Sequence, residues 1–498
     1  MNSANEKQPI RTKIVLVQPS GDQCVQSLFT YHQDNAIGYK PPQAIMILAT
    51  YLLQQEFTNV ECLDAQMEEM SPEQTVDRLA EMKPDIVGIT VWTDFWYPAW
   101  KTVKLLREKI PDCTIILGGP HCAVFPQETL EFSEANYLVV GDGEDVLLNL
   151  LRELSNDHSV TEQPGLWRKI NGEIKAPTIP GAVIDDITKI PVPDRTLLPF
   201  KKYSSVLTPS EYETTMITSR GCPYKCVFCK MDVQKVYARS AEQVIEEFRQ
   251  IEELGISDVQ VYDDTFTWGN ARAMDICQGI IDQGIKVNWA IRDRANRVTE
   301  ELYDLLKRAG CTRVHFGVET GSPRVLKESG KFLTIEQIEK GLRIARESGM
   351  TVLSYYMFGF LDETPEDARM TIDFAKKLKT DYPVFIILIP YPGTAIYNEG
   401  MKRGIITSDH WREFTKNPVP DYQIPNLIEN IMDRETMREL RNTGTRELYF
   451  RPRRIFKELR NISSTKDFSQ KIKLGLILAS EVYKRRSSYS EASSAMYR

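Results

Sequence analysis

Short apolar runs alternate with amphipathic runs along most of this chain, and that alternation restricts its fold more than any other feature. Between Lys13 and about Leu154 there are five apolar runs, namely KIVLVQPS, VECLDA, DIVGITV, TIILGG and YLVVG. Near-continuous apolar strands that alternate with helices are typical of a parallel sheet covered on both faces. We therefore predict an α/β fold that begins with a doubly wound, flavodoxin-like domain over residues 12–154.

A second α/β unit follows. Its apolar runs are TTMITS, DVQVYDD, KVNWAIR, RVHFGVE, TVLSYYMFGF and PVFIILIP. Six β/α repeats are too few for a closed eight-stranded barrel, so we predict a partial (β/α)6 barrel over residues 206–400. Residues 155–205 are rich in Pro and polar residues, which indicates a linker or small subdomain. Residues 401–498 are predicted to form a helical region with a mobile, Ser-rich tail.

Composition limits the location and the partners of the protein. The first twelve residues carry no secretory signal, no apolar run is long enough to span a membrane, and the nine cysteines are scattered, so we expect a cytoplasmic protein with reduced thiols. The net charge of −7 argues against nucleic-acid binding. Residues 434–498 nevertheless hold 16 Lys and Arg against 7 Asp and Glu. The segment KIKLGLILASEVYKRR within them is predicted to be a core helix or a helix in contact with a membrane surface.

The sequence TSRGCPYKCVFCK places three cysteines, Cys222, Cys226 and Cys229, directly after the first strand of the predicted barrel. A turn there gathers three thiolates in a small volume, and thiolates are the ligands of iron–sulfur clusters. A structural zinc site would need four ligands, and no second Cys or His pair lies near by. A zinc knuckle remains the alternative.

This motif resembles the signature of the radical S-adenosylmethionine superfamily, including the aromatic Phe228 before the third cysteine. The resemblance implies a 4Fe–4S cluster whose fourth iron is chelated by the amino and carboxylate groups of S-adenosylmethionine. An electron from the cluster would cleave the carbon–sulfur bond and produce a 5′-deoxyadenosyl radical. The superfamily places this loop after the first strand of a partial barrel, and here the predicted strand TTMITS precedes it.

Other strand ends of the predicted barrel also carry polar residues, which are Asp263, Asp264, Arg292, Arg294 and Glu319. Each could be an ordinary solvated strand end, but a cofactor site needs such residues at one rim of a barrel. By the same resemblance, the expected S-adenosylmethionine contacts are Phe228, Asp264, Arg294, Glu319 and Gly359. The last lies in MFGFLDETPED, where a glycine would let the backbone approach the adenine.

A doubly wound domain before such a barrel resembles the cobalamin-binding subfamily, over about residues 12–400. The matching segments are GYKPP, GITVWT, LGGPH and VVGDGE. The resemblance implies that the corrin lies against the sheet edge and that its nucleotide tail enters between strand and helix. The expected cobalamin contacts are Asp64, Thr90, Thr93, Gly118, Gly119, Gly141 and Gly143. Spacing alone predicts only a nucleotide-like or planar ligand at this edge.

The sequence departs from other cobalamin domains because it has no Asp-x-His-x-x-Gly segment. Its histidines are His32, His121, His158, His315 and His410. We therefore expect cobalt without a protein histidine or its own base below it. His121 could reach the ligand, but we interpret it as a polar loop residue. The aromatic run WTDFWYPAW could serve core packing or wall a chamber over the corrin.

The family resemblance implies a cobalamin-dependent methyltransferase that acts on an unactivated carbon, as bacteriochlorophyllide and hopanoid methylases do. One S-adenosylmethionine would methylate cob(I)alamin, a second would generate the radical, and the substrate radical would take the methyl group from methylcobalamin. We expect a small-molecule substrate, with a chlorophyll-type tetrapyrrole as the best candidate, and an external electron donor such as flavodoxin or ferredoxin. The basic segment RELYFRPRRIFKELR could face a propionate or be a solvated helix. The rival functions are an oxidative cyclase of a magnesium porphyrin ester and a sensor that never cleaves S-adenosylmethionine.

Overall fold

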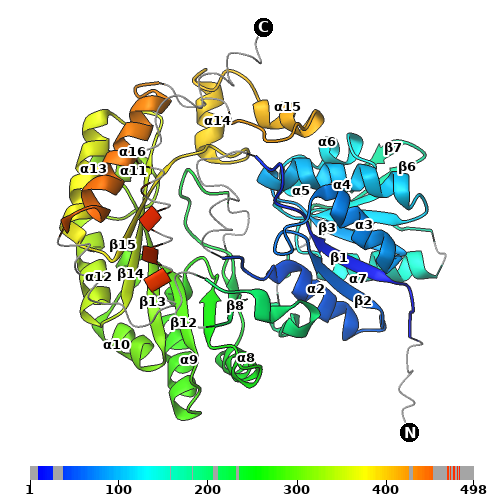
Figure 1. Cartoon of the computed structure of the whole chain (residues 1–498), viewed down its shortest axis with the longest axis horizontal. Helices are drawn as coiled ribbons and strands as arrows, with labels where there is room; N and C mark the ends of the chain where they lie inside the picture. Colours follow the sequence, from blue (N-terminus) through cyan, green and yellow to red (C-terminus); the bar gives the residue numbers. More distant parts are fainter. Residues whose placement is uncertain are drawn as a thin grey trace.

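The computed structural model contains two large sheets, one in each half of the chain (Figure 1). It describes residues 9–25, 38–156, 159–181, 183–184, 186–205, 211–230, 235–424 and 430–452, with residues 468–469, 471–472, 475–476, 479 and 482. His32, His158, the Ser-rich tail and most of the segment 471–486 lie outside the described residues. In Figure 1 the first sheet is blue and cyan and the second is green to yellow.

The amino-terminal sheet has the strand order β2-β1-β3-β4-β5-β6-β7. Its strands are β1 (Ile14–Gln18), β2 (Val60–Asp64), β3 (Ile86–Thr90), β4 (Thr114–Gly118), β5 (Tyr137–Val139), β6 (Leu166–Ile170) and β7 (Glu173–Lys175). The first five pair in parallel, as predicted, and β1 lies between β2 and β3. This order is the flavodoxin-like doubly wound arrangement, whose ligands bind at the carboxyl ends of the strands.

Helices cover both faces of this sheet. They are α2 (Gln43–Leu53), α3 (Pro72–Met82), α4 (Trp96–Lys109), α5 (Pro120–Val124), α6 (Pro126–Glu131) and α7 (Glu144–Ser155). Helix α3 shows how local sequence sets such a boundary, because Ser71 and Gln74 form a capping box and Pro72 opens the first turn. The same device begins the helices at Ala241, Ile335 and Pro365 in the second half.

Strands β6 and β7 come from the region that the sequence analysis treats as a linker or subdomain. They extend the first sheet in antiparallel pairing, β6 on β5 and β7 on β6. Leu166 is buried, whereas the following residues of β6 become progressively more exposed. Because so little of this hairpin faces the core, its sequence lacks the regular alternation of apolar and polar residues that identifies a strand.

The second sheet is a partial barrel of six parallel strands in the order β15-β14-β13-β12-β11-β8. The strands are β8 (Glu213–Met216), β11 (Asp258–Val261), β12 (Asn288–Asp293), β13 (Cys311–Glu319), β14 (Thr351–Phe358) and β15 (Tyr382–Ile387). The predicted six-stranded partial barrel is therefore confirmed. Its connecting helices are α8 (Ala241–Glu253), α9 (Asn270–Asp282), α10 (Glu300–Arg308), α11 (Pro323–Glu328), α12 (Ile335–Glu347) and α13 (Pro365–Leu378).

The helices of the barrel lie on its outer side, away from the first sheet (Figure 1). The core between them and the strands includes fully buried Trp289, Phe316 and Tyr356. The short strands β9 (Ser219–Arg220) and β10 (Tyr237–Ala238) form a separate antiparallel pair. Single 3₁₀ turns complete the ordered elements, namely η1 (Thr93–Phe95), η2 (Ile187–Lys189), η3 (Arg195–Leu197), η4 (Phe200–Lys202), η5 (Phe266–Trp268) and η6 (Ala295–Arg297).

Three later helices follow the barrel, α14 (Ala395–Lys402), α15 (His410–Lys416) and α16 (Arg434–Tyr449), and the first two of them pack at the junction of the two halves. Trp411 of α15 belongs to the same buried apolar cluster as Trp96 of α4. The Trp96 indole donates a 3.0 Å hydrogen bond to the carbonyl oxygen of Thr415. Helix α16 packs on β15. No helix among the described residues is long and apolar enough to cross a bilayer.

Candidate active site

The cysteine loop begins at β9, just beyond the carboxyl end of β8. Buried Asp263, which follows β11, fixes its start. The Asp263 carboxylate accepts hydrogen bonds from the backbone nitrogens of Thr218, at 2.6 Å, and Ser219, at 3.0 Å, and from both hydroxyl groups. The Asp263 carboxylate therefore anchors the start of the cysteine loop, whereas the carboxylate of its neighbour Asp264 makes no such bonds to the described residues of the loop.

The other side of the loop is held by the carboxyl half of the barrel. The backbone nitrogen of Val227 donates a 3.0 Å hydrogen bond to the carbonyl oxygen of Ser329, and the carbonyl oxygen of Val227 accepts one of 2.9 Å from Ile396. The ring of Phe228 meets the ring of Phe360 edge to face, with 5.9 Å between centroids. The loop is thus fixed on both sides before any cofactor binds.

The three thiols are free and lie near one another. Cys222 and Cys226 are half-buried and Cys229 is exposed. Desolvation, together with the negative charges of Cys226 and Asp264, raises the pKa of Cys229 to about 11. Burial also raises the pKa of Cys226, although the Lys331 ammonium and the Arg294 guanidinium oppose this rise. Iron binding would ionise these thiols and release protons.

Within the described residues, no three His, Cys, Asp or Glu side chains converge closely enough to hold a single metal ion. A 4Fe–4S cluster does not require such convergence, because each thiolate binds a different iron. Three separated thiols on one loop, with cationic groups beside them, fit an anionic cluster held by Cys222, Cys226 and Cys229.

Two buried cations stand next to the thiols. The Arg294 guanidinium lies over the ring of Tyr224, 3.5 Å from its centroid, and donates to the carbonyl oxygen of Lys331. The ammonium of Lys331 forms an ion pair with Glu319, and both side chains are almost fully buried. Glu319 ends β13 with a φ of +68°, a conformation that non-glycine residues rarely adopt. Sequence reasoning missed Lys331 and Tyr224, since neither stands out in the sequence.

The structure brings four of the five expected S-adenosylmethionine contacts to this loop. Phe228 belongs to it, and the charges of Asp264, Arg294 and Glu319 act on its thiols. Gly359 lies one residue before Phe360, with a φ of +106°. A Cβ atom there would lie 2.8 Å from the sulfur of Met437, so packing against α16 also requires a glycine. The roles of all five residues remain proposals.

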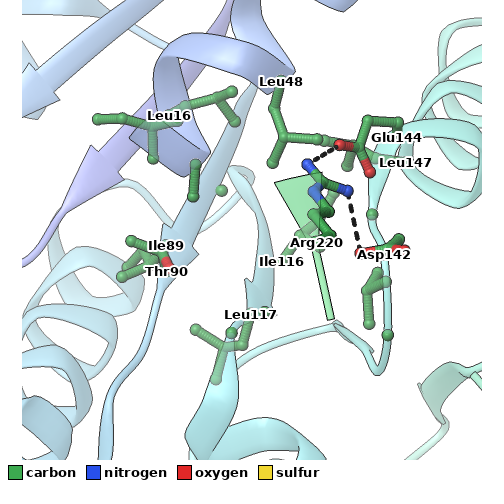
Figure 2. A pocket seen from close by; sticks show the side chains of 18 residues that line it. Leu16, Leu48, Ile89, Thr90, Ile116, Leu117, Asp142, Glu144, Leu147 and Arg220 are labelled. Carbon is green, nitrogen blue, oxygen red and sulfur yellow. Dashed lines mark hydrogen bonds and ion pairs between the residues drawn. The ribbon is translucent and has the colours of Figure 1, made fainter. Parts of the chain in front are cut away.

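A second candidate site is a cavity of about 190 Å³ between the first sheet and helices α2 and α7 (Figure 2). Apolar side chains and glycines line most of it, including Leu16, Ile45, Leu48, Gly88, Ile89, Ile116, Leu117, Val139 and Leu147. Five expected cobalamin contacts also line it, namely Thr90, Gly118, Gly119, Gly141 and Gly143. A narrow apolar slot between sheet and helices fits the flat base at the end of the cobalamin tail.

Two expected cobalamin contacts do not line this cavity. The carboxylate of Asp64 accepts hydrogen bonds from the Tyr203 hydroxyl, at 2.8 Å, and the Met67 backbone nitrogen, at 3.0 Å. The hydroxyl of Thr93 lies 3.3 Å from Nδ1 of His121. Both residues therefore have protein partners at the carboxyl edge of the sheet, and a role for them in binding the corrin stays a proposal.

The interpretation of His121 as a polar loop residue is wrong. It lies in α5, is fully buried, and stacks on Trp96 with 4.7 Å between ring centroids. Burial lowers the pKa of His121 to about 3, so the imidazole is neutral. In the aromatic run, Trp96 is fully buried and serves core packing, whereas Trp92 is 55% exposed, and a chamber over the corrin stays a proposal.

Comparison with known proteins identifies the two domains in which these candidate sites lie. Residues 216–375 match the model of the radical SAM superfamily, and residues 35–151 match that of the B12 binding domain. The chain is 33% identical to the uncharacterized methyltransferase PH0819 of Pyrococcus horikoshii over 380 residues, which cover 75% of this chain and 82% of that protein. These matches define a radical S-adenosylmethionine enzyme with an amino-terminal B12-binding domain.

More distant relatives also match the chain, over different shares of its length. An anaerobic magnesium-protoporphyrin IX monomethyl ester cyclase of Rubrivivax gelatinosus is 27% identical over 74% of this chain and 68% of its own. A bacteriochlorophyllide d C-12(1)-methyltransferase of Chlorobaculum tepidum is 27% identical over 40% of this chain and 43% of its own. The radical S-adenosylmethionine methyltransferase TsrM of Kitasatospora setae, solved with cobalamin and a [4Fe-4S] cluster, has the same fold, with a TM-score of 0.66 and 21% identity over 80% of this chain and 79% of that one.

The chain belongs to the family of cobalamin-dependent radical S-adenosylmethionine methyltransferases. Its cofactors are a 4Fe–4S cluster, S-adenosylmethionine and cobalamin.

Proposed function

We propose that this enzyme transfers a methyl group to an unactivated carbon of a bacteriochlorophyllide-type tetrapyrrole side chain. The observation that carries the proposal is the adjacency of the two sites. Arg220 lines the cavity of the B12-binding domain and stands two residues before Cys222 in the cysteine loop. When bound, one S-adenosylmethionine supplies the methyl group by way of cobalamin, and another, cleaved at the cluster, supplies the radical that abstracts hydrogen from the substrate.

The residues of the chain would position these groups and exclude water. Cys222, Cys226 and Cys229 would hold the cluster, with the cations Arg294 and Lys331 beside it. The apolar cluster that includes Trp96, Trp411 and Phe414 closes the junction of the two halves on one side. A junction that excludes water protects a radical from side reactions, and its packed side chains hold the reacting groups in the correct positions.

Two relatives support the choice of substrate. The cyclase of Rubrivivax gelatinosus is named for a magnesium porphyrin ester, and the methyltransferase of Chlorobaculum tepidum for bacteriochlorophyllide d. The basic carboxy-terminal segment adds little support, because among the described residues the structure gives no contact between its basic residues and the junction of the two halves, and its Glu447 pairs with Arg369 and Lys376 of α13. Most of the remaining basic residues there lie outside the described residues.

The cyclase relative also favours a second candidate function, oxidative ring closure of a magnesium porphyrin ester without methyl transfer. The mass of the product separates the two. Methyl transfer adds one carbon to the substrate, whereas cyclisation adds none.

The decisive experiment uses anaerobically reconstituted enzyme, a strong reductant, S-adenosylmethionine with a deuterated methyl group, and bacteriochlorophyllide d or magnesium-protoporphyrin monomethyl ester. We expect a product that carries the labelled methyl group, together with 5′-deoxyadenosine. An unlabelled cyclised product would establish the second candidate, and the absence of 5′-deoxyadenosine would favour a sensor. A Cys226→Ala variant should form neither product yet still bind cobalamin.

We also propose an external one-electron donor such as flavodoxin or ferredoxin, and a cytoplasmic location. Of the other six cysteines five are buried, and no three of them gather among the described residues, so they do not suggest a second cluster to relay electrons. All nine cysteines are free.

A further inference from the structure

Arg220 belongs to the barrel half of the chain, yet its side chain reaches into the B12-binding domain. Its backbone pairs with Tyr237 in the small β9–β10 ladder, which fixes the start of its side chain. Its guanidinium lies 3.0 Å from a carboxylate oxygen of Asp142 and 2.7 Å from one of Glu144. Figure 2 shows these two contacts, with Arg220 spanning the gap between the two acidic side chains beside the cavity.

The two carboxylates hold the loop that leads into α7. Glu144 opens that helix, directly after the N-cap Gly143, and its side chain is only 3% exposed. Asp142 also accepts a 2.7 Å hydrogen bond from the backbone nitrogen of Ile184. Without Arg220, the buried Glu144 carboxylate would lose its ion pair, which a folded protein tolerates poorly. The loop and the arginine are therefore mutually dependent.

Glycines of the same loop line the cavity. Gly141, Asp142, Gly143, Glu144 and Arg220 contribute to its wall, and the strands and helices supply the rest. The side chain of Arg220 is a quarter exposed, so it lies between the apolar interior of the cavity and solvent. Arg220 and this loop therefore form part of the cavity wall next to solvent.

We propose that Arg220, through its ion pairs with Asp142 and Glu144, holds closed the pocket for the cobalamin tail and links that pocket to the cysteine loop. We call this role of Arg220 a latch. The pocket is thus completed by a residue from the other half of the chain. Release of the tail requires both ion pairs of Arg220 to break. Because Cys222 lies two residues further along, the same rearrangement shifts the first ligand of the cluster. Arg220 is a positioning residue in this account and takes no part in the chemistry.

The release rates of cobalamin and cobinamide together distinguish a latch on the tail from a general effect on the fold. Cobinamide has the corrin ring but lacks the nucleotide tail. Full-length, cluster-reconstituted protein is loaded anaerobically with either compound, and its release is followed by absorbance after dilution into a trap. In Arg220→Gln, we expect cobalamin to dissociate at least tenfold faster than in the wild type, and cobinamide to dissociate at the wild-type rate.

Arg249→Gln is the matched control, because Arg249 also joins two carboxylates, Glu246 and Glu253, but on the surface of α8. It should leave both rates unchanged. Arg220→Lys keeps a cation at the position and should restore part of the slow release. Glu144→Gln should speed cobalamin release as Arg220→Gln does. If the arginine variant fails to fold, the release rates of cobalamin and cobinamide can be compared in Glu144→Gln instead. Equal acceleration for cobalamin and cobinamide, or no acceleration for either, would overturn the latch.

The link to the cysteine loop has its own readout. Electron paramagnetic resonance of the reduced cluster should differ between protein loaded with cobalamin and protein loaded with cobinamide. That difference should vanish in Arg220→Gln and persist in Arg249→Gln. A difference that persists in Arg220→Gln would show that the arginine does not transmit tail binding to the cluster.

Discussion

A Cβ atom on Gly330 would lie 2.8 Å from the carbonyl oxygen of Lys225, which belongs to the cysteine loop. Gly330 also has a φ of +66°, so both the lack of space for a side chain and the backbone conformation favour glycine at this position. We predict that Gly330→Ala displaces the loop and lowers the iron and sulfide bound per chain several-fold. Gly284→Ala is the control, because Gly284 has the same φ with no atom within 4 Å. Equal iron content in the two variants would contradict this account of the loop.

The buried Glu319–Lys331 ion pair leads to a prediction about S-adenosylmethionine binding. Glu319→Gln keeps the shape of the side chain but removes its charge, and Lys331→Met leaves a buried carboxylate without its cation. We predict that each variant weakens S-adenosylmethionine binding at least tenfold, measured by equilibrium dialysis with reconstituted protein. Glu339→Gln removes a comparable but more exposed partner, that of Lys377, and should bind normally. Unchanged affinity in Glu319→Gln would exclude Glu319 from the cofactor site.

The buried Asp64 predicts a specific dependence of stability on pH. Burial raises the pKa of Asp64 to about 6 from its usual 3.8. Between these values the folded state holds a proton that the unfolded state has lost, so the free energy of unfolding falls as pH rises through that window. The loss from this residue is about 3 kcal/mol at most, from two pKa units. Urea unfolding of the wild type and Asp64→Asn should show a stability difference that grows from pH 4 to pH 7 in favour of the variant. A difference independent of pH would be the contrary result.

The hydroxyl of Tyr391 bonds across the junction of the two halves to Asp94, at 2.9 Å from its nearer carboxylate oxygen. Tyr391→Phe leaves that carboxylate without its donor, and we predict a loss of about 1–3 kcal/mol in the free energy of unfolding, measured by urea denaturation. Tyr51→Phe removes a bond to Asp145 that lies at the surface and should cost less. An equal loss in both variants would contradict the larger contribution predicted for the bond at the junction.

The regular parts of the fold could be predicted because each strand is short, apolar and flanked by amphipathic helices. The parallel strands of both sheets and the position of the cysteine loop follow from that pattern. The β6–β7 hairpin escaped prediction because Leu166 is its main core residue and edge strands carry little periodicity. His121 was misjudged for a related reason: its burial depends on Trp96 and Phe125, which come to it through tertiary packing.

The candidate site likewise contains some residues that can be recognised in the sequence and others that cannot. Cys222, Cys226 and Cys229 are recognisable from spacing, because one loop supplies all three. Lys331 and Arg220 are not, because their partners lie 12 and more than 70 residues away in the sequence. Only the fold brings Arg220 to Asp142 and Lys331 to Glu319, and a single sequence contains no signal for such pairs.

The central claim is that three thiolates leave one iron of a four-iron cluster open for S-adenosylmethionine. Mössbauer spectroscopy of protein reconstituted with ⁵⁷Fe, with and without S-adenosylmethionine, tests it most directly. The account predicts four irons per chain and a changed spectrum for one of them when S-adenosylmethionine binds. Four irons that do not respond to S-adenosylmethionine, or a purified protein that holds zinc in place of iron, would contradict it.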